Sequence, residues 1–172
     1  MPFTPFHLGA ALVVKPGLSK HFSLITFGIA QIAMDIEPGI GMLTGAEVLH
    51  GPSHTFVASL AIALLVMLVA PGICNFLVRH WNKEVTHYRM PWLVEAFPVS
   101  RAAVIAGAFF GTFSHVFLDS LMHYDIRPFS PFSDANPLFG LITHDGVYQF
   151  CAIAGLLGGI TWLAMKSINR DI

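Results

Sequence analysis

Four long apolar stretches constrain the fold of this chain more than any other feature of its sequence. A membrane-spanning α-helix needs about 20 predominantly apolar residues, and the chain provides four such stretches, at residues 22–39, 54–78, 102–123 and 146–165. Only 11% of its residues are charged, whereas soluble domains average about 25%. The sequence therefore predicts an all-α, polytopic membrane protein that forms a single membrane-embedded domain over its 172 residues.

A shorter apolar piece, residues 5–14, precedes the first predicted crossing. Thr4 and Pro5 favour a helix start, because threonine caps helices and proline tolerates the first helical position. The piece stops at Lys15 and Pro16, so we expect a half-membrane or packed helix of about ten residues, too short to span. Because its first lysine follows the apolar run, we expect no cleavable signal sequence.

Lysine and arginine positions predict the orientation, because cytoplasmic loops collect these residues. With four crossings, only Arg127 falls on the outer side. We therefore expect the linker at about residues 79–101 and the C-terminus to be cytoplasmic. The residues that fall on the cytoplasmic side are Lys15, Lys20, Arg79, Lys83, Arg89, Arg101, Lys166 and Arg170.

Several chemistries are not expected from this sequence. Its two cysteines, Cys74 and Cys151, fall in different predicted helices and are interpreted as core thiols, not as a disulfide or metal site. The chain has neither a glycine-rich phosphate loop nor a basic patch, so no nucleic-acid partner is expected. The oligomeric state stays open.

Histidines and acids collect at the outer ends of the predicted crossings. His115, Asp119 and His123 are spaced i, i+4, i+8, which places them within an arc of roughly 80° on one helix face. Gly51 and Pro52 lie between His50 and His54 and predict a turn there. Ser53 is the expected N-cap of the second crossing. Pro38 biases Glu37 toward extended backbone, which would turn Asp35 and Glu37 toward the same site. The full layer comprises Asp35, Glu37, His50, His54, His115, Asp119, His123, Asp125, His144 and Asp145.

Imidazoles and carboxylates are the ligands of zinc and related divalent metals. One tetrahedral zinc needs four ligands, and this layer holds more, so we expect two or more ions, with manganese as the alternative to zinc. Other readings stay open: His115, Asp119 and His123 could form an interhelical hydrogen-bond network, Asp145 a helix cap, and Arg127 a snorkelling side chain.

Four segments also resemble a known family, the YdjM-like family of predicted membrane-bound metal-dependent hydrolases. These segments read MPFTPFHLGAAL, MDIEPG, LHGPSHTF and FSHVFLDSLMHYDIRPF. The chain departs from the family in having Glu37 as its second acid and no arginine before its HGPSH element. The resemblance implies an outer-end site near His123 and Asp125, with metal ligands at His7, Asp35, His54, His115 and Asp119.

A more remote resemblance concerns the order of the ligands along the chain. This order is similar to that of zinc-dependent phospholipases C and related single-strand nucleases. Tyr148 stands where that pattern has a carboxylate, and the N-terminal tryptophan ligand is missing. The similar set is His7, Asp35, His54, His115, Asp119, His123 and His144.

Together these features predict a metal-dependent hydrolase in a bacterial-type cytoplasmic membrane, with its site on the periplasmic side. Its expected substrate is a lipid phosphoester or pyrophosphate, held by Arg127, with Glu37, Asp125 or Asp145 as general base. The alternatives are a metal- or proton-coupled transporter and a structural membrane module whose helices are held together by a metal ion. The apolar inner halves of the crossings argue against a conduction path.

Overall fold

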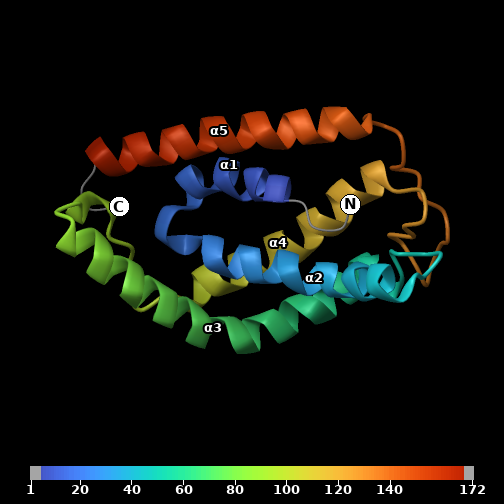
Figure 1. Ribbon diagram of the computed structural model, residues 1–172, viewed down its shortest axis with the longest axis horizontal. Helices are drawn as coiled ribbons and strands as arrows, with labels where there is room; N and C mark the ends of the chain where they lie inside the picture. Colours follow the sequence, from blue (N-terminus) through green and yellow to red (C-terminus); the bar gives the residue numbers. More distant parts are fainter. Residues whose placement is uncertain (1–4, 169–172) are drawn as a thin grey trace.

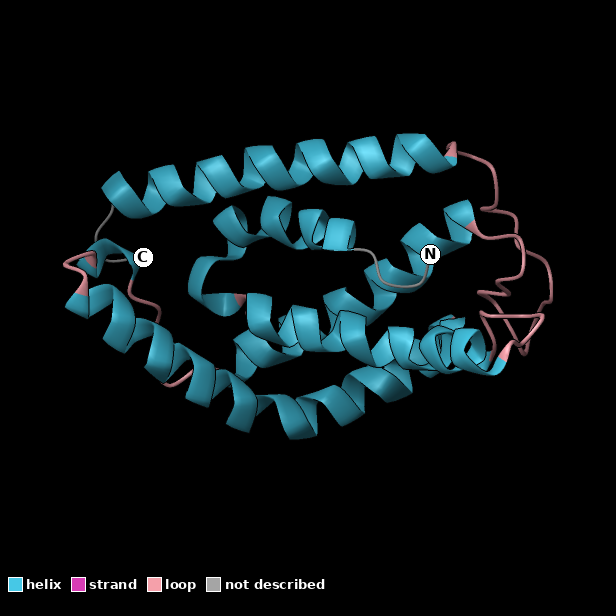
Figure 2. Ribbon diagram, viewed as in Figure 1, coloured by secondary structure: helices cyan, strands magenta, loops and turns pink. Residues whose placement is uncertain are grey.

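Helices form all the regular secondary structure of residues 5–168, the part of the chain that this computed structural model describes (Figure 2). Thr4 and Arg170, named above as a helix cap and a cytoplasmic cation, lie outside the described residues. Within residues 5–168 there is no strand, and the predicted all-α fold is confirmed. The helices are α1 (Leu8–Leu18), α2 (Leu24–Thr44), α3 (Phe56–His87), α4 (Arg101–Met122) and α5 (His144–Ile168), with 3-10 turns η1 (Pro5–His7), η2 (Ser19–His21), η3 (Pro52–His54) and η4 (Pro91–Leu93).

Three helices, α3, α4 and α5, are long and apolar enough to cross a membrane. They correspond to three of the four predicted crossings. α2 corresponds to the remaining predicted crossing, at residues 22–39. It has 21 residues and so a length of about 32 Å, but Gln31, Asp35 and Glu37 interrupt its apolar run. The crossing by α2 therefore stays a prediction.

Two helices end later than predicted, and each contains a proline. α1 runs through Pro16 to Leu18, and α2 runs through Pro38 to Thr44. The end of α2 is instead set by Gly45, whose left-handed φ of 71° terminates the helix. Glu37 is consequently helical and does not have the extended backbone predicted for it.

The start and end of α3 also differ from the prediction. Thr55, not Ser53, caps the helix, with its hydroxyl accepting the Ala58 N–H at 3.0 Å. At the other end the helix continues to His87, so the first part of the predicted linker is helical. Residues 79–87 contain neither glycine nor proline, and nothing in them stops the helix as it leaves the apolar stretch.

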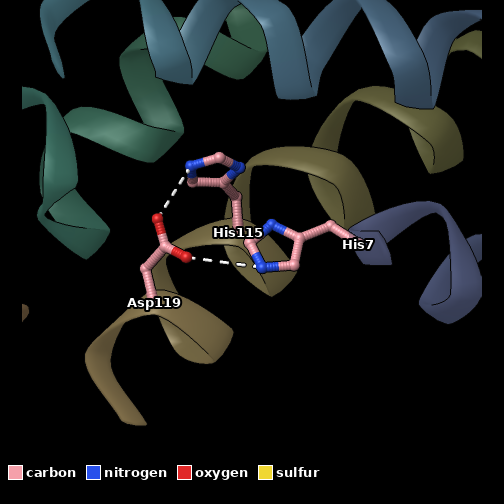
Figure 3. Close-up of side chains that lie close together, drawn as sticks. All are labelled: His7, His115 and Asp119. Carbon is pink, nitrogen blue, oxygen red and sulfur yellow. Dashed lines mark ion pairs between the residues drawn. The ribbon is translucent and has the colours of Figure 1, made fainter. Parts of the chain in front are cut away.

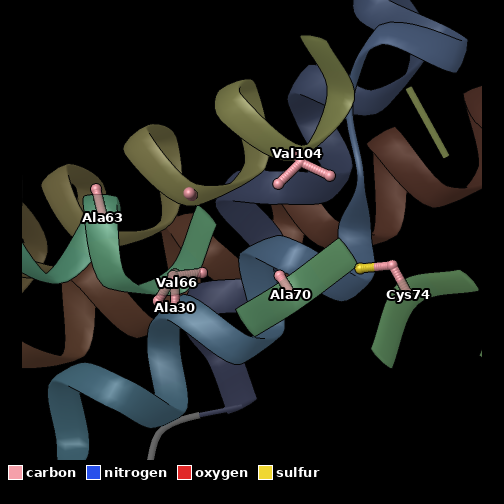
Figure 4. Packing of buried hydrophobic residues seen from close by; sticks show 7 residues of the cluster. Ala30, Ala63, Val66, Ala70, Cys74 and Val104 are labelled. Carbon is pink, nitrogen blue, oxygen red and sulfur yellow. The ribbon is translucent and has the colours of Figure 1, made fainter. Parts of the chain in front are cut away.

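Small side chains bring α2, α3 and α4 close together. A buried cluster between these helices contains Ala30, Ala63 and Ala70, together with the free thiol of Cys74 (Figure 4). On α4, a Cβ at Gly111 would come within 2.6 Å of the Ala30 Cβ. Such small-residue contacts are typical of helices packed in membranes. They hold α2 against the face of α4 that carries His115.

α1 lies between α5 and α2 (Figure 1). A buried charge cluster ties α1 to α5 at one end. Glu95, in the loop before α4, lies 3.5 Å from Lys15 Nζ and 2.6 Å from Lys166 Nζ. Lys15 also donates to the carbonyls of Ser19 and Phe22, both at 3.0 Å. Lys15 and Lys166 thus share one end of the bundle, as the sequence predicts, while the histidines gather at the other end of α1.

Candidate metal centre

α4 supplies the middle of a buried cluster of histidines and carboxylates. His115 and Asp119 lie one turn apart on this helix, and both side chains are buried. The Asp119 carboxylate lies 3.1 Å from His115 Nε2 and 3.4 Å from His7 Nε2 (Figure 3). It also lies 3.6 Å from His54 Nε2. One carboxylate therefore faces three imidazoles, which come from α4, η1 and η3.

His7 reaches the cluster because α1 packs tightly along α5. A Cβ at Gly9 would collide with the backbone carbonyl of Cys151, so the absence of a side chain at Gly9 permits this close approach. η1 then places the His7 ring 5.1 Å from the ring of His115, measured between centroids. The structure thus brings His7 next to His115 and Asp119, and its role as a metal ligand stays a prediction.

Gln31 on α2 orients His115. The Gln31 amide donates to the Gly111 carbonyl at 2.8 Å, and its oxygen lies 2.7 Å from His115 Nδ1. His115 Nδ1 therefore carries a proton and donates to the Gln31 oxygen, while the other ring nitrogen, Nε2, faces Asp119. This arrangement is typical of metal-binding histidines, whose second nitrogen donates to a fixed acceptor. Gln31 is not among the site residues predicted from the sequence, although it stands four residues before Asp35, on the same face of α2.

Asp35 and His54 complete the buried part of the cluster. Asp35 on α2 lies 3.5 Å from His115 Nε2. His54 Nδ1 lies 2.9 Å from Ser53 Oγ, and its Nε2 lies 3.3 Å from His115 Nε2. Glu37 accepts hydrogen bonds from both the backbone N–H and the hydroxyl of Ser53. Glu37 thus supports the His54 turn through its side chain.

A second, shallower group, here named the rim triad, consists of His50, His123 and Asp125. The Asp125 carboxylate lies 3.0 Å from His50 Nδ1 and accepts the His50 backbone N–H at 3.2 Å. The rings of His50 and His123 lie 4.3 Å apart, centroid to centroid. The rim triad adjoins the buried cluster through His54, whose ring centroid is 4.9 Å from that of His50.

Burial and hydrogen bonding set the protonation states of the groups outside the spanning helices. Burial lowers the pKa of His54, and it lowers the pKa of His123 to about 4. Burial alone would raise the pKa of Asp125, but the hydrogen bonds and charge of His50 lower it. Neutral imidazoles and ionised carboxylates are the forms that bind metal ions.

The donor atoms fit divalent metal ions. Four groups of three residues each offer ligand atoms within 4.8 Å of one another. Among the described residues, buried atoms of His7, Asp35 and His50 make no hydrogen bond, and such atoms are costly unless another partner binds them. The groups are His7–His115–Asp119, Asp35–His54–His115, His50–His54–Asp119 and His50–His123–Asp125.

His123 joins the site by a different route from the one predicted. α4 ends at Met122, and His123 has extended backbone with φ −115° and ψ 124°. The i+8 helical position predicted for His123 is therefore wrong. Its side chain instead belongs to the rim triad, and its ring lies 6.4 Å from that of His144.

Three other predicted site residues lie on the surface. His144 and Asp145 begin α5, with side chains 51% and 90% exposed, and belong to none of the four groups. Arg127 is exposed and lies 3.5 Å from Asp134. These three residues therefore lie outside the compact cluster formed by the four groups.

Comparison with known families agrees with the membrane character of this bundle. The family model described as YdjM inner membrane protein matches residues 5–170. The chain belongs to the YdjM inner membrane protein family. This membership and the three apolar helices of the chain fit an integral membrane protein. No curated protein and no solved structure matches the chain. The predicted hydrolase activity and the likeness to phospholipases C find no support in these matches.

Proposed function

We propose that this YdjM-family protein is a membrane-bound, metal-dependent hydrolase that acts on a phosphoester or pyrophosphate of a lipid. The observation that carries this proposal is the overlap of the four metal-capable groups, which share His50, His54, His115 and Asp119. Overlapping groups suit two or more adjacent ions, with zinc favoured by the histidines and manganese as the alternative. Divalent ions at such a site activate water and stabilise the charge of a reacting phosphate.

Glu37 is the residue we propose as general base. Its side chain is 35% exposed and lies 4.0 Å from His54 Nδ1, yet it belongs to none of the metal-capable groups. Asp125, a second candidate, belongs to the rim triad, and Asp145 lies on the surface. Glu37 can therefore take a proton beside the cluster while the other acids hold metal or stay in solvent.

We further propose that the cluster faces the periplasm and that the C-terminus is cytoplasmic. The lysines and arginines support this orientation, because all but Arg127 fall on the other side if α2 crosses the membrane. His115 and Asp119 occupy the last two turns of α4, at the outer end in this orientation. A site at headgroup depth favours a lipid substrate over a freely soluble one.

The test combines metal analysis with hydrolysis by detergent-purified protein. We expect two or more equivalents of zinc or manganese per chain and release of phosphate from phospholipid or polyprenyl phosphate substrates. Glu37→Gln is expected to retain its metal and lose about 10²- to 10⁴-fold in rate, the usual contribution of a general base. Glu47→Gln, at an exposed position of the neighbouring loop, is the matched control.

Two outcomes would contradict the proposal. A single tightly held ion would indicate a closed structural site, because structural zinc sites use four ligands and leave no open position. Failure of the fully metallated native protein to cleave any phosphate ester would argue for a transport or structural role.

A further inference from the structure

A groove of about 840 Å³ is lined by two members of the rim triad, His50 and Asp125, and by the first turns of α3. Its lining includes the polar side chains of His50, Asp125 and Arg127, and the apolar side chains of Val57 and Ala61 from the start of α3. We infer that this groove is the substrate site and that it takes an amphiphile, with a phosphate at the polar end and an apolar chain along α3. This inference rests on the proposed function and specifies where its lipid substrate binds.

The polar end has the groups that bind a phosphate beside a metal centre. His50 and Asp125 belong to the rim triad, so a phosphate in the groove lies next to that candidate metal group. The buried Nε2 of His50 makes no hydrogen bond within residues 5–168. Within residues 5–168, the Arg127 side chain makes a single ion pair, an exposed one with Asp134 at 3.5 Å. Exchanging this carboxylate for a phosphate would cost little, because exposed ion pairs contribute about 0–1 kcal/mol, and arginine binds phosphate with paired donors.

The apolar end follows a helix that is suited to lipid. Val57 is 49% exposed, and it lies in the first turn of α3, one of the three helices apolar enough to cross a membrane. Ala58 and Ala61 both line the groove and stand three residues apart, so they share one face of the helix. Their small side chains leave room for an alkyl chain beside α3. A short, water-soluble phosphate would leave this end of the groove unused.

The experiment compares two non-hydrolysable probes, hexadecylphosphonate and butylphosphonate, on the zinc-loaded full chain by native mass spectrometry. Ala61→Trp fills the apolar end, and Ala152→Trp, at an exposed position on α5, is the matched control. We expect Ala61→Trp to bind hexadecylphosphonate about tenfold more weakly, equivalent to losing the burial of about two methylene groups. Butylphosphonate binding is expected to stay unchanged, and Arg127→Gln is expected to weaken both probes.

The outcomes separate this inference from the proposed function. Equal hexadecylphosphonate binding by Ala61→Trp and Ala152→Trp would overturn the groove as the chain site, whether or not the protein hydrolyses phosphate esters. If Ala61→Trp weakens the binding of hexadecylphosphonate but not of butylphosphonate, and the native protein hydrolyses no phosphate ester, the groove is supported and the proposed hydrolase is contradicted. Zinc content and helical circular dichroism verify the fold of each variant, and Ala58→Leu replaces Ala61→Trp if the tryptophan is not accommodated.

Discussion

Replacing Asp119 with alanine is expected to abolish the proposed metal binding at the buried cluster and, with it, the proposed hydrolase activity. The Asp119 carboxylate lies within 3.6 Å of the imidazoles of His7, His54 and His115, and it belongs to two of the four metal-capable groups. Loss of a group that merely supports a metal ligand lowers metal affinity by about 10- to 100-fold. Loss of a shared ligand should exceed this range.

Metal titration of the chelator-stripped protein, followed by elemental analysis, measures this effect. Glu47→Ala provides an acid-to-alanine control in an exposed loop and should bind metal as the native chain does. Circular dichroism before metal addition establishes that Asp119→Ala is folded. Native metal content in a folded Asp119→Ala protein would show that Asp119 is not a metal ligand and would contradict the centre proposed around it.

Gly158→Ala is expected to destabilise the protein, whereas the same change at the neighbouring Gly159 is not. A Cβ at Gly158 would collide with the backbone of Leu12 and Val13 on α1, whereas a Cβ at Gly159 meets nothing within 4 Å. Forcing an extra carbon into a packed contact costs about 1–3 kcal/mol. At Gly159 alanine should instead stabilise α5 by up to about 1 kcal/mol, because glycine is a poor helix former.

This pair of variants also tests how His7 is positioned. Separation of α1 from α5 should move η1, so Gly158→Ala is expected to bind less metal as well as to have a lower Tm. Thermal unfolding monitored by tryptophan fluorescence, with metal analysis of the same samples, measures both effects. Equal Tm values for Gly158→Ala and Gly159→Ala would mean that the packing of α1 on α5 is not tight in the membrane protein.

Local sequence spacing predicted some site contacts and failed for others. The i, i+4 spacing of His115 and Asp119 placed them correctly, because both lie within one uninterrupted helix. The same rule failed for His123, since α4 stops one residue earlier and the chain turns. The extended backbone predicted for Glu37 from the following Pro38 also failed, because α2 continues through that proline and Glu37 contacts Ser53 from within the helix.

The sequence by itself determined the all-helical membrane character and the separation of the histidine layer from most of the lysines and arginines. These properties follow from apolar run length and from the order of charged residues along the chain. Tertiary structure decided which members of the layer meet, for example that Gln31 and His7 adjoin His115 while His144 stays at the surface. Helical periodicity defines a face of each helix, but the rotation and depth of that helix depend on contacts with its neighbours, such as Gly111 with Ala30 and Gly9 with Cys151.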